Sequence, residues 1–86
     1  MKSTYINLAI GKTLESFMKE YGLTQTEIAA ISGVSRLKIT RIISGTTPLR
    51  VDILLLLLES MQALTPMRFF NRLRKVRFKY KMEIDV

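Results

Sequence analysis

The sequence contains no cysteine, no histidine and no tryptophan. Without cysteine there can be no disulfide, thiol nucleophile or thiolate ligand, and without histidine there is no imidazole base and no His-ligated metal. Carboxylate chemistry remains, but the seven Asp and Glu residues are scattered and form no evident pair. We therefore expect neither an enzyme nor a bound metal or cofactor.

Long apolar segments are also lacking. The longest uninterrupted run, 53–58, lies between Asp52 and Glu59, whereas a membrane-spanning helix needs about 20 apolar residues. The first eight residues carry Lys2 and polar Ser, Thr and Asn residues where a secretory signal would be apolar. The sequence predicts a cytoplasmic protein without membrane contact.

The remaining composition describes one small basic domain. The chain has 86 residues and a formal charge of +7. Its hydrophobic residues make up 48% of the chain, a fraction that fits a folded globule better than a disordered basic arm. The charge is uneven: residues 67–86 hold seven Lys and Arg but only two acids. A basic globule of this kind most often binds nucleic acid, though charge alone is a weak argument for that function.

Apolar spacings of three and four residues indicate a mostly helical chain of four to five short helices. Thr24 and Glu27 fit a capping box, Ser35 fits a helix N-cap, and Gly33 suits the turn between the two helices. The predicted helices cover about 6–21, 24–32, 35–44, 50–63 and 67–75.

Two short helices joined through Gly33 form a helix-turn-helix pattern. At about 100° per residue, the third helix places Ile39, Ile42 and Ile43 on the side facing the body. The opposite arc carries arginines, hydroxyls and one aliphatic side chain. This composition suits a DNA major groove because arginine can donate two hydrogen bonds to the edge of guanine. This arc holds Arg36, Leu37, Thr40, Arg41 and Ser44, with Lys38 at its margin.

Residues 25–45, QTEIAAISGVSRLKITRIISG, resemble the lambda-repressor-like (Xre/Cro-type) helix-turn-helix, and the preceding IGKTLESFMKEYGLT resembles the first helix of that family. The resemblance covers about 10–58. Ser32 stands where the family usually has an apolar core residue, and Ile31 is a candidate replacement. The landmark residues are Gln25, Ala29, Gly33, Val34, Ile39 and Ile42.

The resemblance implies roles for individual side chains. Arg36, Leu37 and Arg41 would occupy the base-reading positions, with Thr40 between them. Phosphate-holding positions would fall on Gln25, Ser44, Thr46 and Thr47, and the predicted DNA-contact set is completed by Ser35 and Lys38.

Five consecutive leucines, residues 54–58, point in every direction around a helix. One face can cover the preceding helices, and the other leucines would be covered by the C-terminal segment of the same chain or by a dimer partner. We predict that Leu54, Leu55 and Leu58 contribute to dimerisation.

Residues 76–86 alternate strictly between apolar and charged side chains, which predicts a β-strand; a disordered basic tail is the alternative. A lone strand leaves backbone groups unpaired, so an antiparallel ribbon between two chains is the hypothesis. Nearby bases such as Arg68 and Arg74 would lie along flanking DNA phosphates or merely solubilise the tail. The predicted ribbon contacts are Val76, Phe78, Tyr80, Met82 and Ile84.

Together these patterns predict a DNA-binding domain over 1–64 and a basic dimerisation extension over 65–86. The expected function is a nucleoid-associated transcriptional regulator, a phage-type repressor acting as a homodimer on palindromic double-stranded DNA. One alternative is an antitoxin that regulates its own operon. Another is a protein-docking module that does not bind DNA. A protein partner such as a toxin or an antirepressor is compatible with the sequence.

Overall fold

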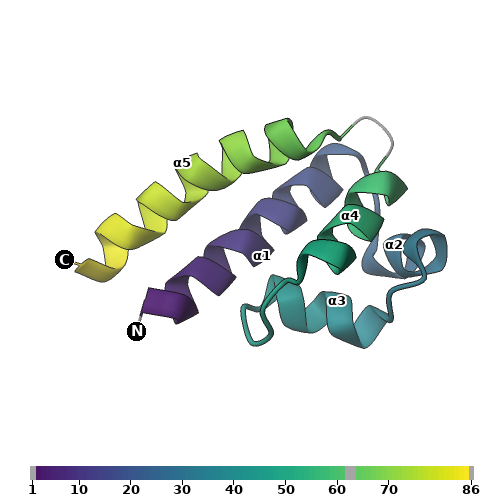
Figure 1. Ribbon diagram of the computed structural model, residues 1–86, viewed down its shortest axis with the longest axis horizontal. Coiled ribbons are helices and arrows are strands. Elements are labelled where there is room, and N and C mark those ends of the chain that lie inside the picture. Colours follow the sequence, from purple (N-terminus) through teal and green to yellow (C-terminus); the bar gives the residue numbers. More distant parts are fainter. Residues whose placement is uncertain (1, 62–63, 86) are drawn as a thin grey trace.

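A computed structural model of the chain describes residues 2–61 and 64–85, with side-chain environments given for 5–61 and 64–79. The described residues form an all-helical fold, shown in Figure 1. Its helices are α1 (Lys2–Glu20), α2 (Gln25–Ser32), α3 (Arg36–Ile43), α4 (Val51–Ser60) and α5 (Pro66–Asp85).

Helix α1 occupies the middle of the molecule. Helix α5 runs along one side of it, and α3 packs on the opposite side (Figure 1). Helix α2 contacts α3 and α4 and completes the body. From residue 5 to residue 18 every residue of α1 is buried or half-buried, because the helix is covered from both sides. The core joins all five helices through Leu14, Phe17, Ile28, Ile39, Ile42, Leu57 and Phe69.

The local signals between α2 and α3 are formed as predicted. The Thr24 hydroxyl accepts from the Glu27 backbone N–H at 3.1 Å, and the Glu27 carboxylate accepts from the Thr24 N–H at 3.0 Å. Gly33 ends α2 with a φ of 77°, a left-handed conformation that glycine adopts without a steric penalty. The Ser35 hydroxyl caps α3 by accepting from Lys38 N–H at 3.2 Å. The predicted helix-turn-helix is therefore confirmed.

The predicted strand over 76–86 is wrong across residues 76–85, which continue α5 as a helix; Val86 lies outside the described residues. The segment has no second strand to pair with among the described residues, and a helix satisfies its backbone hydrogen bonds internally. Phe69, Leu73 and Val76 also share one helical face, of which Phe69 is buried in the core. The helical spacing of three to four residues therefore prevails over the two-residue alternation of a strand.

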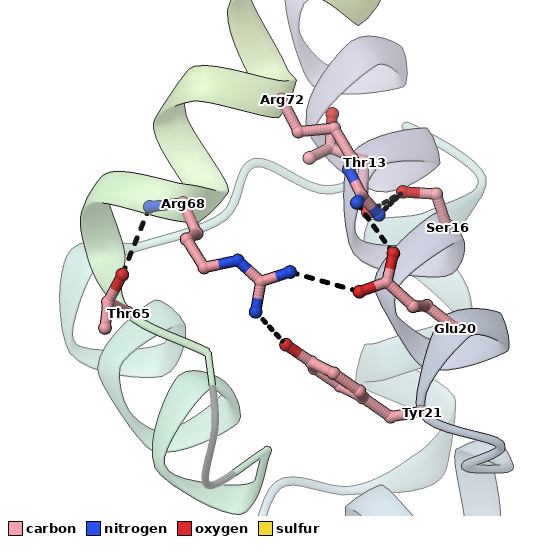
Figure 2. Close-up of polar contacts among 7 residues, drawn as sticks. All are labelled: Thr13, Ser16, Glu20, Tyr21, Thr65, Arg68 and Arg72. Carbon is pink, nitrogen blue, oxygen red and sulfur yellow. Dashed lines mark hydrogen bonds and ion pairs between the residues drawn. The ribbon is translucent and has the colours of Figure 1, made fainter.

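Two arginines of α5 hold this helix on α1, as Figure 2 shows. Arg72 lies 2.7 Å from one carboxylate oxygen of Glu20, and Arg68 lies 3.1 Å from the other. Arg68 also donates to the Tyr21 hydroxyl at 2.6 Å. The Arg72 guanidinium stacks 3.7 Å from the centre of the Phe17 ring, a close cation–π contact. The basic residues predicted as phosphate ligands or solubilising charges are, at these two positions, structural.

The leucine run divides between core and surface. Leu54, Leu57 and Leu58 are buried, whereas Leu55 and Leu56 remain 47% and 41% exposed. The chain's own fold thus covers three of the five leucines.

Candidate nucleic-acid interface

Helix α3 has one face in the core and one face in solvent. Ile39 and Ile42 are at most 1% exposed and Ile43 is 7% exposed, so the inner face anchors the helix. The outer arc matches the sequence prediction, with Lys38 half-buried at its edge. Its exposed residues are Arg36, Leu37, Thr40, Arg41 and Ser44.

The two arginines of this arc remain available for a ligand. Within the described part of the chain, neither Arg36 nor Arg41 takes part in an ion pair. Leu37 lies between them along the sequence and is 58% exposed. The face therefore offers two guanidinium groups and one aliphatic group to a partner.

The start of α2 is tied to the middle of α3. The Thr40 hydroxyl lies 2.5 Å from the Gln25 side-chain oxygen and 3.0 Å from the Arg36 carbonyl oxygen, so one proton is shared between two acceptors. The predicted contact residues Gln25 and Thr40 are thus adjacent in space although fifteen positions apart in sequence.

A second polar group closes the C-terminal end of α3. The hydroxyls of Ser44 and Thr46 lie 3.0 Å apart, and both donate to the Arg41 carbonyl oxygen, at 3.0 and 3.1 Å. Thr47 follows as a half-buried residue. Because a hydroxyl has two lone pairs and can rotate, these groups can redirect their protons toward an incoming phosphate.

Glycine 11 is a positioning residue that the sequence analysis missed. A Cβ at Gly11 would lie 2.7 Å from the carbonyl carbon of Ile43 and closer still to the carbonyl oxygens of Ile42 and Ile43. Only glycine lets α1 approach the end of α3 this closely. The available signal was a glycine inside an otherwise regular apolar helical pattern.

Two further placements depart from expectation at α2. Ile31 is 61% exposed and does not fill the core position left by Ser32. Ser32 is half-buried, donates to the Ile28 carbonyl at 2.7 Å and accepts from the Val34 N–H at 3.1 Å. The serine is accommodated because its hydroxyl is fully hydrogen-bonded.

Among the residues whose side chains the structure describes, those predicted for dimerisation do not share one surface. Leu54 and Leu58 lie in the core of the chain itself, while Leu55 is exposed on α4. On α5, Val76 is half-buried and Phe78 is 65% exposed. Tyr80, Met82 and Ile84 have side chains outside the described set. The exposed apolar residues that sequence reasoning missed beside Leu55 are Val51 and Leu56.

The described residues contain no group of three or more acidic residues that could hold a metal ion. None of their helices combines the length and apolarity needed to cross a membrane.

Comparison with known proteins agrees with this geometry. A family model described as "Helix-turn-helix" (HTH_3) matches residues 14–66, which include α2, α3 and α4. A solved structure of a point mutant of the restriction-modification controller protein C.Esp1396I superposes with a TM-score of 0.79. The two share 22% identity, and the match covers 86% of this chain and 97% of that one. No curated protein matches. The chain belongs to the lambda-repressor-like (Xre/Cro-type) helix-turn-helix family of DNA-binding transcriptional regulators, which is not a class of enzymes.

Proposed function

We propose that α3 enters the major groove of double-stranded DNA and that this chain is a sequence-specific repressor. The observation that carries the proposal is the division of α3 into a core face and an exposed face with two arginines outside any ion pair among the described residues. Arg36 and Arg41 read guanine edges, and Leu37 covers a thymine methyl group.

The polar residues around α3 hold the DNA backbone on either side of this contact. Gln25 is the first residue of α2, and its side-chain amide can donate to a phosphate oxygen. Phosphate contacts fix the register of the recognition helix without reading sequence. The proposed backbone contacts are Gln25, Ser35, Lys38, Thr40, Ser44, Thr46 and Thr47.

We infer that the chain acts as a homodimer on a palindromic operator. Two recognition helices must lie about 34 Å apart to read two half-sites in consecutive turns of the groove. The surface that best suits a two-fold contact is the exposed stripe of α4, on which Val51, Leu55 and Leu56 are 72%, 47% and 41% exposed and which also carries Asp52 and Glu59. Apolar residues gathered on one helix face favour burial against a partner.

In this proposal residues 1–64 make the DNA contacts, and residues 65–86 complete the fold instead of forming a ribbon. Phe69 of α5 is buried against the core, and Arg72 binds Glu20 of α1. Occlusion of a promoter by a bound dimer then represses transcription.

Footprinting on the DNA upstream of its own gene tests the proposal, with sedimentation of the same sample. We expect a protected palindrome whose half-sites are one helical turn apart, and a complex of two chains per site. Shuffled DNA of equal composition serves as the control. Absence of protection even at low salt, where phosphate contacts are strongest, would reject DNA binding by α3.

A further inference from the structure

Helix α5 has an outer face that no other described part of the chain covers. Met67, Phe70 and Phe78 are 73%, 50% and 65% exposed. Their spacing, with Arg74 between them, places all four on one side of the helix, opposite the face of Phe69 and Val76. We call this set of four residues the outer face of α5.

Positive charge surrounds the outer face. Residues 66–79 contain six Lys and Arg and no acid. Arg68 and Arg72 are engaged with Glu20, whereas Arg74, Lys75 and Arg77 form no ion pair within the described residues. These three cations and Phe78 line an open hollow of about 520 Å³. The hollow can therefore receive a carboxylate beside an aromatic ring.

The outer face is not placed to assist DNA recognition by α3. Helix α5 lies on the opposite side of α1 from α3 (Figure 1). DNA seated against Arg36 and Arg41 would lie on the far side of the molecule from Arg74 and Phe78. The charge of α5 is thus directed toward a different ligand.

The composition of the outer face favours a protein over the other anionic ligands. Duplex phosphates are bound by basic and polar groups and leave exposed Phe and Met side chains unused. A lipid surface would have to accept Arg74 in the middle of the apolar stripe. Pairing with a second α5 would bring together two segments that each carry six Lys and Arg and no acid over residues 66–79, which like-charge repulsion opposes. Aromatic residues, Met and Arg together are the composition enriched in protein interfaces.

We propose that the outer face of α5 docks an acidic amphipathic segment of another protein. Carboxylates of the partner pair with Arg74, Lys75 and Arg77, and its apolar side chains cover Met67, Phe70 and Phe78. The surface works independently of DNA binding, so a protein partner and the operator can be held at the same time.

Peptide display on the full chain tests this proposal. A random 16-residue library is selected against the immobilised protein, and enriched peptides are then titrated in solution. We expect peptides that combine Asp and Glu with Leu or aromatic residues. Their affinity should fall about tenfold or more in Phe78→Ala, and Arg74→Glu should weaken acidic peptides while favouring basic ones.

The matched control is Ile31→Ala, which shortens an exposed apolar side chain on α2 and should leave peptide affinity unchanged. Melting temperatures and operator binding of Phe78→Ala should equal those of the wild type, because Phe78 is exposed and lies far from α3. The proposal is overturned if enriched peptides lack acidic residues or bind Phe78→Ala equally well. It is also overturned if oligouridine RNA or phosphatidylglycerol vesicles bind through Phe78 and the peptides do not.

Discussion

The Thr40 hydroxyl lies 2.5 Å from the side-chain oxygen of Gln25, which links the first residue of α2 to the middle of the recognition helix. Both residues are proposed DNA-backbone ligands. The Thr40 hydroxyl donates its proton to the Gln25 oxygen and leaves the Gln25 NH2 group to donate to a phosphate. The bond orients the Gln25 amide before DNA arrives, so less conformational entropy is lost on binding.

This link predicts coupled effects on DNA affinity. Gln25→Ala and Thr40→Val should each weaken operator binding, and a double-mutant cycle should give a coupling energy of about 0.5–1 kcal/mol. Electrophoretic mobility shifts of the four proteins measure it. Thr26→Ala, an exposed neighbour on α2, is the control. Strict additivity of the two substitutions would show that the hydrogen bond does not organise the site.

The two arginines of the recognition helix should determine sequence preference. Arg36→Ala and Arg41→Ala are expected to keep the fold and lose about 1–3 kcal/mol each of discrimination between operator and mismatched DNA. Lys79→Ala removes one charge from α5 and should preserve that discrimination. Titration of each protein with operator and single-mismatch duplexes at fixed salt gives the two affinities whose ratio is the discrimination. Equal discrimination in the wild type and both arginine variants would contradict the assignment.

Substitution of Gly11 should damage the fold through α3. A methyl group there would overlap the backbone carbonyls of Ile42 and Ile43, so Gly11→Ala should cost about 3 kcal/mol or more of unfolding free energy. Backbone atoms cannot turn aside as a flexible side chain can. Urea denaturation measures the loss. Gly22→Ala is the comparison, because no atom lies within 4 Å of its added Cβ and its cost arises from the φ of 67° alone. A smaller loss at Gly11 than at Gly22 would show that the close approach is not required.

The Glu20 contacts predict a specific pH dependence. The hydrogen bond from Arg72 lowers the pKa of Glu20 below its ordinary value of 4.5, with further lowering by the nearby charge of Arg72 and by Arg68, against an opposing effect of desolvation. A depressed pKa in the folded state stabilises the protein above pH 4.5, and this contribution is lost as the pH falls through the folded-state pKa. The melting temperature should therefore exceed that of Glu20→Gln at neutral pH, and the difference should shrink below about pH 4.5.

Glu59→Gln is the matched control, since Glu59 is an exposed carboxylate outside the ion pairs of the described residues. Thermal unfolding followed by circular dichroism between pH 3 and pH 7 gives the comparison. A difference between wild type and Glu20→Gln that stays constant across this range would show that the carboxylate does not stabilise α5 on α1 through its charge.

The exposed stripe of α4 should control association. Leu55→Arg introduces a charge into the proposed dimer contact and should weaken self-association by about tenfold or more. Met67→Arg makes a similar change at an exposed apolar residue of α5 and should leave the dimer intact. Sedimentation equilibrium of the two variants measures the dissociation constant of each dimer. A tight dimer of Leu55→Arg would place the two-fold contact elsewhere.

Most of what the sequence predicted correctly depends on interactions between residues that are close together in the chain. Thr24, Glu27, Gly33 and Ser35 act through neighbours within a few residues, so their roles in the two central helices could be inferred without a structure. The isoleucines of α3 were placed in the core by helical spacing alone. The exposed arc around Arg36 and Arg41 followed directly from that spacing.

The failures all depend on contacts distant in sequence. Residues 76–85 alternate as a strand would, yet they continue the helix α5, whose earlier part is anchored to the core through Phe69 and Leu73. The pairing of Arg72 with Glu20 spans 52 positions. Likewise, which leucines of α4 are buried depends on where the other helices lie, so Leu54 and Leu58 could not be separated from Leu56 by pattern alone.

The placement of α1 has a consequence for how the sequence can vary. Every residue from 5 to 18 is buried or half-buried, so packing constrains most of the circumference of this helix, least at Lys12 and Glu15, whose side chains are 40% and 33% exposed. In α3 the constraint on folding recurs once per helical turn, at Ile39, Ile42 and Ile43. Saturation mutagenesis scored for abundance should therefore show broad intolerance along α1, relaxed at Lys12 and Glu15, and a periodic pattern along α3, which leaves the exposed arc of α3 free to acquire new DNA preferences.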